Sequence, residues 1–270
     1  MNLKKWGKAI LIMTAVLILS LHFDLYEALI FRGEKLPRQT HFTFDFPFEE
    51  LNFQANDGGQ INAVWMKTQI PSKGIIIYNH GNKDNLIRWA NESQYLTQLG
   101  FDVMVYDYRG YGKSTGQRSE SNFYGDAWLI YQQCLKLYPA DSIIVYGRSL
   151  GTGPACWLAA NAPIKAAVLE TPYTNMTDLI EDQLLGFPMR WFLNYSFDNS
   201  LHLKNTQSPV FIVHGTEDQL ISVKHAYKLA ANFNHPKSYL LVIPGGQHNN
   251  LRNYSSYQKS LAAFLNSIGF

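Results

Sequence analysis

A serine between glycines is the residue best placed for chemistry. Gly147–Gly151 reads Gly-Arg-Ser-Leu-Gly and stands directly after an apolar run, Ser142–Tyr146, and before a helical stretch, Leu150–Asn161. A sharp turn from strand to helix would expose the Ser149 hydroxyl at a helix N-terminus, where free N–H groups favour developing negative charge. Glycines leave room for such a turn. We therefore predict that Ser149 is a nucleophile rather than a helix cap.

A serine hydroxyl is a poor nucleophile at neutral pH, so it needs a histidine as base and a carboxylate to orient that histidine. Two later loops supply these groups. Asp218 follows the apolar run Val210–Val213, and His248 follows Tyr239–Ile243. Both loops are expected at the same sheet edge as Ser149. We predict His248 as general base and Asp218 as the acid.

Other residues compete for these roles. Glu217 neighbours Asp218, and Glu170 ends the apolar run Ala166–Leu169, so either glutamate is an alternative acid. His80 and His214 precede glycines in turns and are interpreted as structural.

The loop Asn79–Asn85 follows the apolar run Gly74–Tyr78 and has the sequence Asn-His-Gly-Asn-Lys-Asp-Asn. Its position suits one donor of an oxyanion hole, the pair of N–H groups that stabilises a tetrahedral oxyanion. We predict the backbone N–H groups of Asn82 and Leu150 as the two donors.

The elements that must position these residues follow an alternating pattern. Short runs that are apolar throughout are typical of strands buried on both faces in a parallel sheet. Helical stretches separate them, which favours an α/β fold with a mostly parallel central sheet flanked by helices. Before these, alternating residues from Phe42 to Lys67, with a turn at Asn56–Gly59, predict antiparallel strands and a hairpin.

One interval is too long for a simple connection. Thr171 to Ser208 is interpreted as a small helical cap, about residues 172–207. Its aromatic segment, Gly186–Phe197, could line an acyl pocket or pack the cap against the core. The side chains that would bind substrate there are Phe187, Met189, Trp191 and Phe192.

The N-terminal segment is apolar from Ala9 to Phe23 and follows three lysines, Lys4, Lys5 and Lys8. This pattern predicts a hydrophobic helix that anchors the protein in a membrane, within residues 1–30, ahead of a hydrolase domain over 42–270. The lysines place the N-terminus in the cytoplasm and the hydrolase domain on the outer side. Cleavage of the segment as a signal peptide, giving a secreted protein, is the alternative.

Composition narrows the function further. The formal net charge is +2 and no basic cluster marks a helix, so nothing favours nucleic acid as a partner. Cys134 and Cys156 fall in predicted helices and are interpreted as buried apolar residues. The histidines are dispersed without metal-ligand spacing, and we predict neither a metal nor a cofactor.

Together these motifs resemble the α/β-hydrolase superfamily. The resemblance rests on Asn79–Asn82, Tyr106–Ser114, Gly147–Gly151, His214–Asp218 and Gly245–His248, in that order. It is closest to small membrane-anchored serine hydrolases related to depalmitoylases and lysophospholipases. The resemblance also implies the chain order of serine, acid and histidine, and an internally paired, structural Arg109.

The expected activity is therefore that of a serine hydrolase, which cleaves carboxylic esters or thioesters through an acyl-enzyme. The expected partner is a small-molecule ester or lipid-like substrate. Two alternatives remain open: a serine peptidase of the prolyl-peptidase type, and a catalytically silent binding protein with the same fold.

Overall fold

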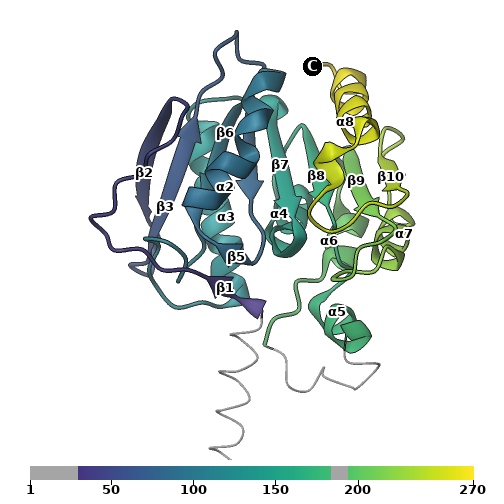
Figure 1. Ribbon diagram of the computed structural model, residues 1–270, viewed down its shortest axis with the longest axis horizontal. Coiled ribbons are helices and arrows are strands. Elements are labelled where there is room, and N and C mark those ends of the chain that lie inside the picture. Colours follow the sequence, from purple (N-terminus) through teal and green to yellow (C-terminus); the bar gives the residue numbers. More distant parts are fainter. Residues whose placement is uncertain (1–29, 184–193) are drawn as a thin grey trace, which may run out of the picture.

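The computed structural model describes residues 30–183 and 194–270. One sheet of eight strands runs in the order β10-β9-β8-β7-β4-β6-β3-β2 (Figure 1). Neighbours from β10 to β6 are parallel, whereas β3 is antiparallel to both β6 and β2. The strands are β2 (Phe48–Gln54), β3 (Gln60–Met66), β4 (Ile75–Asn79), β6 (Asp102–Tyr106), β7 (Ile143–Arg148), β8 (Ala166–Glu170), β9 (Val210–Gly215) and β10 (Tyr239–Ile243). The predicted mostly parallel α/β sheet is confirmed.

Helices cover both faces of this sheet. The helices are α2 (Leu86–Ser93), α3 (Glu120–Leu135), α4 (Thr152–Asn161), α5 (Met176–Gln183), α6 (Asn199–Asn205), α7 (Lys224–Ala230) and α8 (Ser255–Ser267). Residues of α2 and α8 share one hydrophobic cluster, and residues of α3, α4, α6 and α7 share the other. The sheet therefore forms the middle of three layers.

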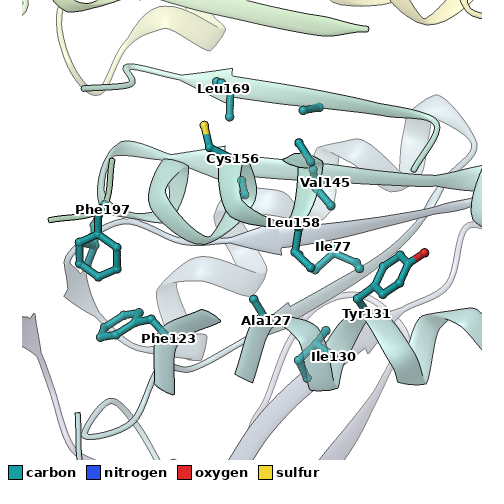
Figure 2. Close-up of a cluster of buried hydrophobic side chains, with 14 of the residues drawn as sticks. Ile77, Phe123, Ala127, Ile130, Tyr131, Val145, Cys156, Leu158, Leu169 and Phe197 are labelled. Atoms are coloured by element: carbon teal, nitrogen blue, oxygen red, sulfur yellow. The ribbon is translucent and has the colours of Figure 1, made fainter. Parts of the chain in front are cut away.

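Strand β4 shows why its sequence is apolar throughout. Ile75 and Ile77 belong to the cluster with α3 and α4, whereas Ile76 and Tyr78 belong to the cluster with α2 and α8. Figure 2 shows the first cluster, where Ile77 lies near Leu158 of α4 and Tyr131 of α3. Because successive side chains point to opposite faces, a central strand needs apolar residues at every position.

The two cysteines are free and fully buried in this first cluster, which confirms their interpretation as buried apolar residues. Burial raises the pKa of both thiols, so neither is a reactive thiolate.

The N-terminal part of the described chain differs from expectation. Phe42–Phe46 alternates like a strand but forms none, and its phenylalanines stack instead: the Phe42 and Phe44 ring centroids lie 5.7 Å apart. Alternation here reflects aromatic packing against the cluster of α2 and α8. Ahead of it, β1 (Arg32–Gly33) pairs in parallel with β5 (Lys83–Asp84), a contact between segments too short for periodicity to reveal.

The predicted cap spans α5, residues 184–193 and α6. Residues 184–193 lie outside the described part of the chain, as do Phe187, Met189, Trp191 and Phe192. Helix α6 packs on α4, and its Leu203 is buried in the core. Figure 1 shows α5 beyond the lower end of the sheet, on the same side as β1 and β5. The cap and the domain boundaries remain predictions.

The predicted localisation is corrected. No helix within residues 30–183 and 194–270 is both long and apolar enough to cross a membrane. The longest of these helices, α3, has 16 residues. At 1.5 Å per residue, such a helix extends about 24 Å, short of a hydrocarbon core of about 30 Å. This finding contradicts the predicted localisation, a membrane anchor with an outward hydrolase domain. The segment predicted to form the anchor falls within residues 1–29, which lie outside the described residues.

Candidate active site

Ser149 occupies a sharp turn between β7 and α4. Its φ of 52° is positive, a conformation that side-chain-bearing residues rarely adopt and that marks a strained backbone. The flanking glycines make the turn possible: a Cβ on Gly151 would lie 2.0 Å from the Asn79 carbonyl oxygen, and one on Gly147 would lie 2.6 Å from the Gly151 carbonyl oxygen. The sequence Gly-x-Ser-x-Gly is thus required by close backbone approach on both sides of the serine.

His248 lies beside Ser149, and Asp218 lies beside His248. His248 Nε2 is 3.1 Å from Ser149 Oγ, and His248 Nδ1 is 2.7 Å from Asp218 Oδ2. A carboxylate only accepts hydrogen bonds, so Nδ1 carries the hydrogen and Nε2 is left as an acceptor for the serine hydroxyl. The loops after β7, β9 and β10 therefore bring three residues, up to 99 positions apart, into one hydrogen-bonded chain.

Asp218 is held in its charged form. Burial alone would raise its pKa, but hydrogen bonds from His214 and His248, the charge of His248 and the N–H of Ile221 outweigh burial. The pKa of Asp218 consequently lies well below its usual range. Its Oδ1 accepts the Leu220 and Ile221 N–H groups at 2.8 and 2.9 Å, which fixes the orientation of the carboxylate.

The two competing carboxylates have other positions. Glu170 ends β8 and is fully buried, but its oxygens face the Arg148 guanidinium at 3.3 Å and the Tyr146 hydroxyl. Glu217 is exposed to solvent. Asp218 is therefore the one of the three carboxylates that contacts His248.

The two predicted oxyanion donors lie next to the serine. Asn82, Ser149 and Leu150 line one cavity of about 110 Å³. The rest of its wall is mostly apolar and is formed by Ile30, Tyr173, Met176, Leu179, Ile180 and Ile221, with Gln183 as a polar member. Helix α5 thus supplies apolar lining through Met176, Leu179 and Ile180. Residues 187–192, which the sequence assigned to this role, lie outside the described residues.

A second cavity of about 150 Å³, which we call the polar cavity, also reaches Ser149; it shares Asn82, Leu179, Gln183 and Ile221 with the first and differs from it in having charged lining. Its lining includes Lys83, Arg88, Arg148, His248 and Asn249. The two cavities therefore adjoin at Ser149, and charged side chains line only the second of them.

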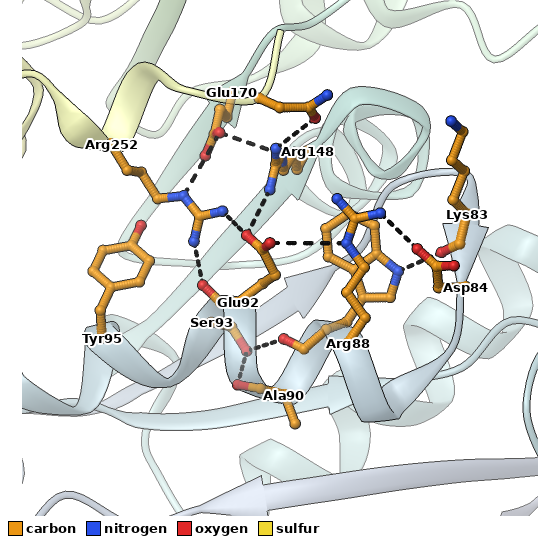
Figure 3. A network of polar contacts seen from close by, with 12 residues as sticks. Lys83, Asp84, Arg88, Ala90, Glu92, Ser93, Tyr95, Arg148, Glu170 and Arg252 are labelled. Atoms are coloured by element: carbon orange, nitrogen blue, oxygen red, sulfur yellow. Dashed lines mark hydrogen bonds and ion pairs between the residues drawn. The ribbon is translucent and has the colours of Figure 1, made fainter.

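A buried charged network beneath the polar cavity was not predicted. Arg148, the residue before Ser149, lies 3.3 Å from Glu170 and 3.1 Å from Glu92, and it donates to Asn249 Oδ1 at 2.9 Å. Arg252 binds the same Glu92 from the loop that bears His248 (Figure 3). The network joins the neighbour of Ser149 to the neighbour of His248. The sequence does contain one signal of this network: Arg148 lies within a turn that is expected to be buried, and a buried charge needs partners.

Arg109 is a structural residue, as the resemblance implied. Its guanidinium donates to both oxygens of Asp126 at 2.8 Å and also pairs with Asp57. Within the described residues, no group of three or more His, Cys, Asp or Glu side chains could hold a metal ion.

The sequence is similar to a known family model and to two curated proteins. Residues 74–208 match the family model described as alpha/beta hydrolase fold. The alpha/beta hydrolase domain-containing protein 17B of Homo sapiens is 30% identical over 220 residues, which cover 78% of this chain and 73% of that protein. The protein of the same name from Xenopus tropicalis is 30% identical over 216 residues, covering 77% and 72%.

Solved structures share the fold. The esterase Pf2001 of Pyrococcus furiosus superposes with a TM-score of 0.68 at 18% identity, over 87% of this chain and 100% of that one. Est1E from Butyrivibrio proteoclasticus, solved with ferulic acid, gives 0.67 at 17% identity over 80% and 98%. At such identities the likeness concerns the fold alone.

Proposed function

The chain belongs to the alpha/beta hydrolase fold family, and on that basis we propose that it is a serine hydrolase of carboxylic esters or thioesters. The observation that supports this activity most strongly is the hydrogen-bonded chain from Asp218 through His248 to Ser149. Serine, imidazole and carboxylate in this arrangement are the groups that acyl transfer requires.

The reaction has two halves. Ser149 Oγ attacks the carbonyl carbon while His248 Nε2 takes its proton, and the resulting oxyanion is stabilised by the Asn82 and Leu150 N–H groups. The carbon–oxygen or carbon–sulfur bond then breaks, and His248 returns the proton to the departing alcohol or thiol. Water attacks the acyl-serine in the same way and releases the carboxylic acid.

The two cavities suggest how a substrate lies. The apolar cavity suits the acyl group, because its wall is formed by Met176, Leu179 and Ile180 of α5. The polar cavity contains His248, which must reach the leaving group to protonate it. Lys83 and Asn249 on the same wall can donate hydrogen bonds to a polar leaving group.

Labelling with a fluorophosphonate probe tests the nucleophile. We expect an adduct on Ser149, located by mass spectrometry, that is lost in Ser149→Ala and retained in Ser256→Ala, a change at an exposed serine of α8. Folded wild-type protein without an adduct would overturn the proposal in favour of a binding protein. Labelling with hydrolysis of peptides but not of esters or thioesters would favour the peptidase.

A matched pair of variants tests the acid. Asp218→Asn should lower kcat for p-nitrophenyl esters by about 10⁴-fold, the size of effect that loss of the orienting carboxylate has in serine proteases. Glu217→Gln, one residue away and exposed, should leave kcat within about twofold of wild type, since surface changes away from a site have small effects. The reverse ranking would assign the role to Glu217.

A further inference from the structure

A short N-terminal segment lies against the loop that bears Asn82. We call residues Ile30–Lys35 the strap. The Arg32 N–H donates to the Asn82 carbonyl at 2.8 Å, and the Glu34 N–H donates to the Asp84 carbonyl at 3.1 Å. On its other edge, the Glu34 carbonyl accepts the Gly112 N–H at 2.8 Å. The strap therefore bridges two loops that are not neighbours in the main sheet.

Phe31 fixes the strap in place. Its ring is 5% exposed and lies 5.3 Å from the Phe123 ring of α3 and 4.7 Å from the Tyr195 ring, centroid to centroid. Burying an aromatic side chain stabilises such a segment by about 1.5–3 kcal/mol, so this short element has an anchor beyond its backbone bonds.

The Asn82 carbonyl has a second donor, the Tyr111 hydroxyl at 3.0 Å. Burial raises the pKa of Tyr111, so this hydroxyl stays protonated. Strap and tyrosine are interlocked, because a Cβ on Gly33 would lie 2.3–2.7 Å from atoms of the Tyr111 ring. Only a glycine lets the strap pass this ring.

The peptide on the other side of Asn82 is fixed too. His80 Nδ1 lies 2.7 Å from the Gly81 carbonyl oxygen, and since a carbonyl only accepts, Nδ1 donates. This carbonyl shares a rigid peptide plane with the Asn82 N–H. Both planes flanking Asn82 are thus fixed by hydrogen bonds, and two of the three donors belong to the strap and Tyr111.

We propose that the strap and Tyr111 are positioning residues of the oxyanion hole: they fix the Asn82–Lys83 peptide so that the Asn82 N–H faces the carbonyl attacked by Ser149. The inference rests on the proposed function, in which this N–H is one of two oxyanion donors. Loss of a whole donor typically costs roughly 100- to 1000-fold in rate, so a displaced donor should cost less, about tenfold.

Two variants and a matched control test the proposal. Gly33→Ala places a methyl group against the Tyr111 ring, at a residue whose φ lies outside the left-handed region. Tyr111→Phe removes only the hydroxyl. Gly125→Ala, in α3, is the control, because its added Cβ meets nothing within 4 Å. Far-UV circular dichroism and urea unfolding establish that each variant is folded.

Esterase kinetics and binding of a boronic acid, which forms a tetrahedral adduct with the serine, are measured together. We expect kcat to fall about tenfold in Gly33→Ala and Tyr111→Phe with KM within about twofold, and boronate affinity to fall in parallel, because the donor acts in the transition state. Gly125→Ala should match wild type in both. A general loss of structure would lower the active fraction without weakening boronate affinity.

The outcomes separate the two proposals. Wild-type protein that neither hydrolyses esters nor reacts with the fluorophosphonate probe overturns the proposed function. Active wild type with unchanged kcat and boronate affinity in folded Tyr111→Phe overturns the positioning role alone, and this conclusion stands even if Gly33→Ala does not fold.

Discussion

Two loops flank Ser149, and different interactions fix them. The loop with Asn82 is bound by backbone hydrogen bonds to the strap and by packing of Tyr111. The loop with His248 is bound through side-chain charges, because Asn249 and Arg252 reach the buried network of Arg148, Glu92 and Glu170 (Figure 3). The bonds to the Asn82 carbonyl are thus neutral, whereas the loop with His248 is joined to buried ions.

The difference predicts which changes each loop tolerates. Backbone bonds form whatever the side chain, so the oxyanion loop depends on few residue identities, chiefly Gly33 and Tyr111. Buried ions behave differently: a partner left alone in the interior loses both its hydration and its counter-charge. The base side should therefore be the more sensitive to substitution and to pH.

The largest effect is expected from Arg148→Met, which leaves Glu170 buried with Arg252 at 4.0 Å as its nearest remaining cation. Breaking a buried pair costs about 3 kcal/mol or more. Urea unfolding should show this loss in the free energy of unfolding. Adding Glu170→Gln to the same variant should recover part of it. If Arg148→Met alone is as stable as wild type, the loop with His248 does not depend on the buried ions.

A smaller effect should follow Asn249→Ala, which removes the bond from Arg148 to the residue after His248. A hydrogen bond to a charged group contributes about 1.5 kcal/mol, and partial exposure reduces this value, so kcat should fall about fivefold with little change in KM. Asn253→Ala, at an exposed asparagine of the same loop, is the control. If Asn249→Ala and Asn253→Ala have equal kinetics, the bond from Arg148 to Asn249 does not contribute to activity.

Tyr95→Phe probes the far end of the network. Its hydroxyl lies 2.8 Å from that of Tyr257, which in turn contacts Tyr146 at 2.8 Å. We expect a loss of about 1 kcal/mol in unfolding free energy. Ester hydrolysis should be unchanged, in contrast to Tyr111→Phe on the oxyanion side. A parallel fall in kcat would show that the far end also positions the base.

The smallest effect concerns pH. Burial opposes ionisation of Glu92, but Arg252, Arg148 and Arg88 outweigh it and lower its pKa. A lowered pKa means that its contribution to stability is complete above the unfolded value of about 4.3 and is lost as pH falls toward the folded value. In urea unfolding, the difference between wild type and Glu92→Gln should shrink from pH 7 to pH 3.5. A widening difference would contradict the assigned sign.

The sequence was most informative where a strict pattern served both chemistry and structure. Gly147–Gly151 predicted a tight turn because only glycine permits the close approach found there, and apolar runs such as Ser142–Tyr146 predicted the central strands because both faces are buried. The order of these strands in the sheet is set by packing between residues far apart, which periodicity does not encode.

The features that the sequence did not predict depend on contacts between segments that lie far apart in the chain. Arg32–Gly33 is too short to show any period, and its partner Lys83–Asp84 looked like an ordinary loop. Phe42–Phe46 had the period of a strand without a neighbouring strand to bond. The sequence motif gives Arg148 no role, although its burial requires Glu92 and Glu170, which come from other elements.

The contact between Glu92 and Arg252 has a consequence for folding. It joins residues 160 positions apart, so the charged network closes only after most of the chain has already collapsed around the sheet. During refolding, helices and strands should therefore recover before His248 is fixed beside Ser149. We therefore expect any esterase activity to return later than far-UV circular dichroism when the unfolded chain is refolded.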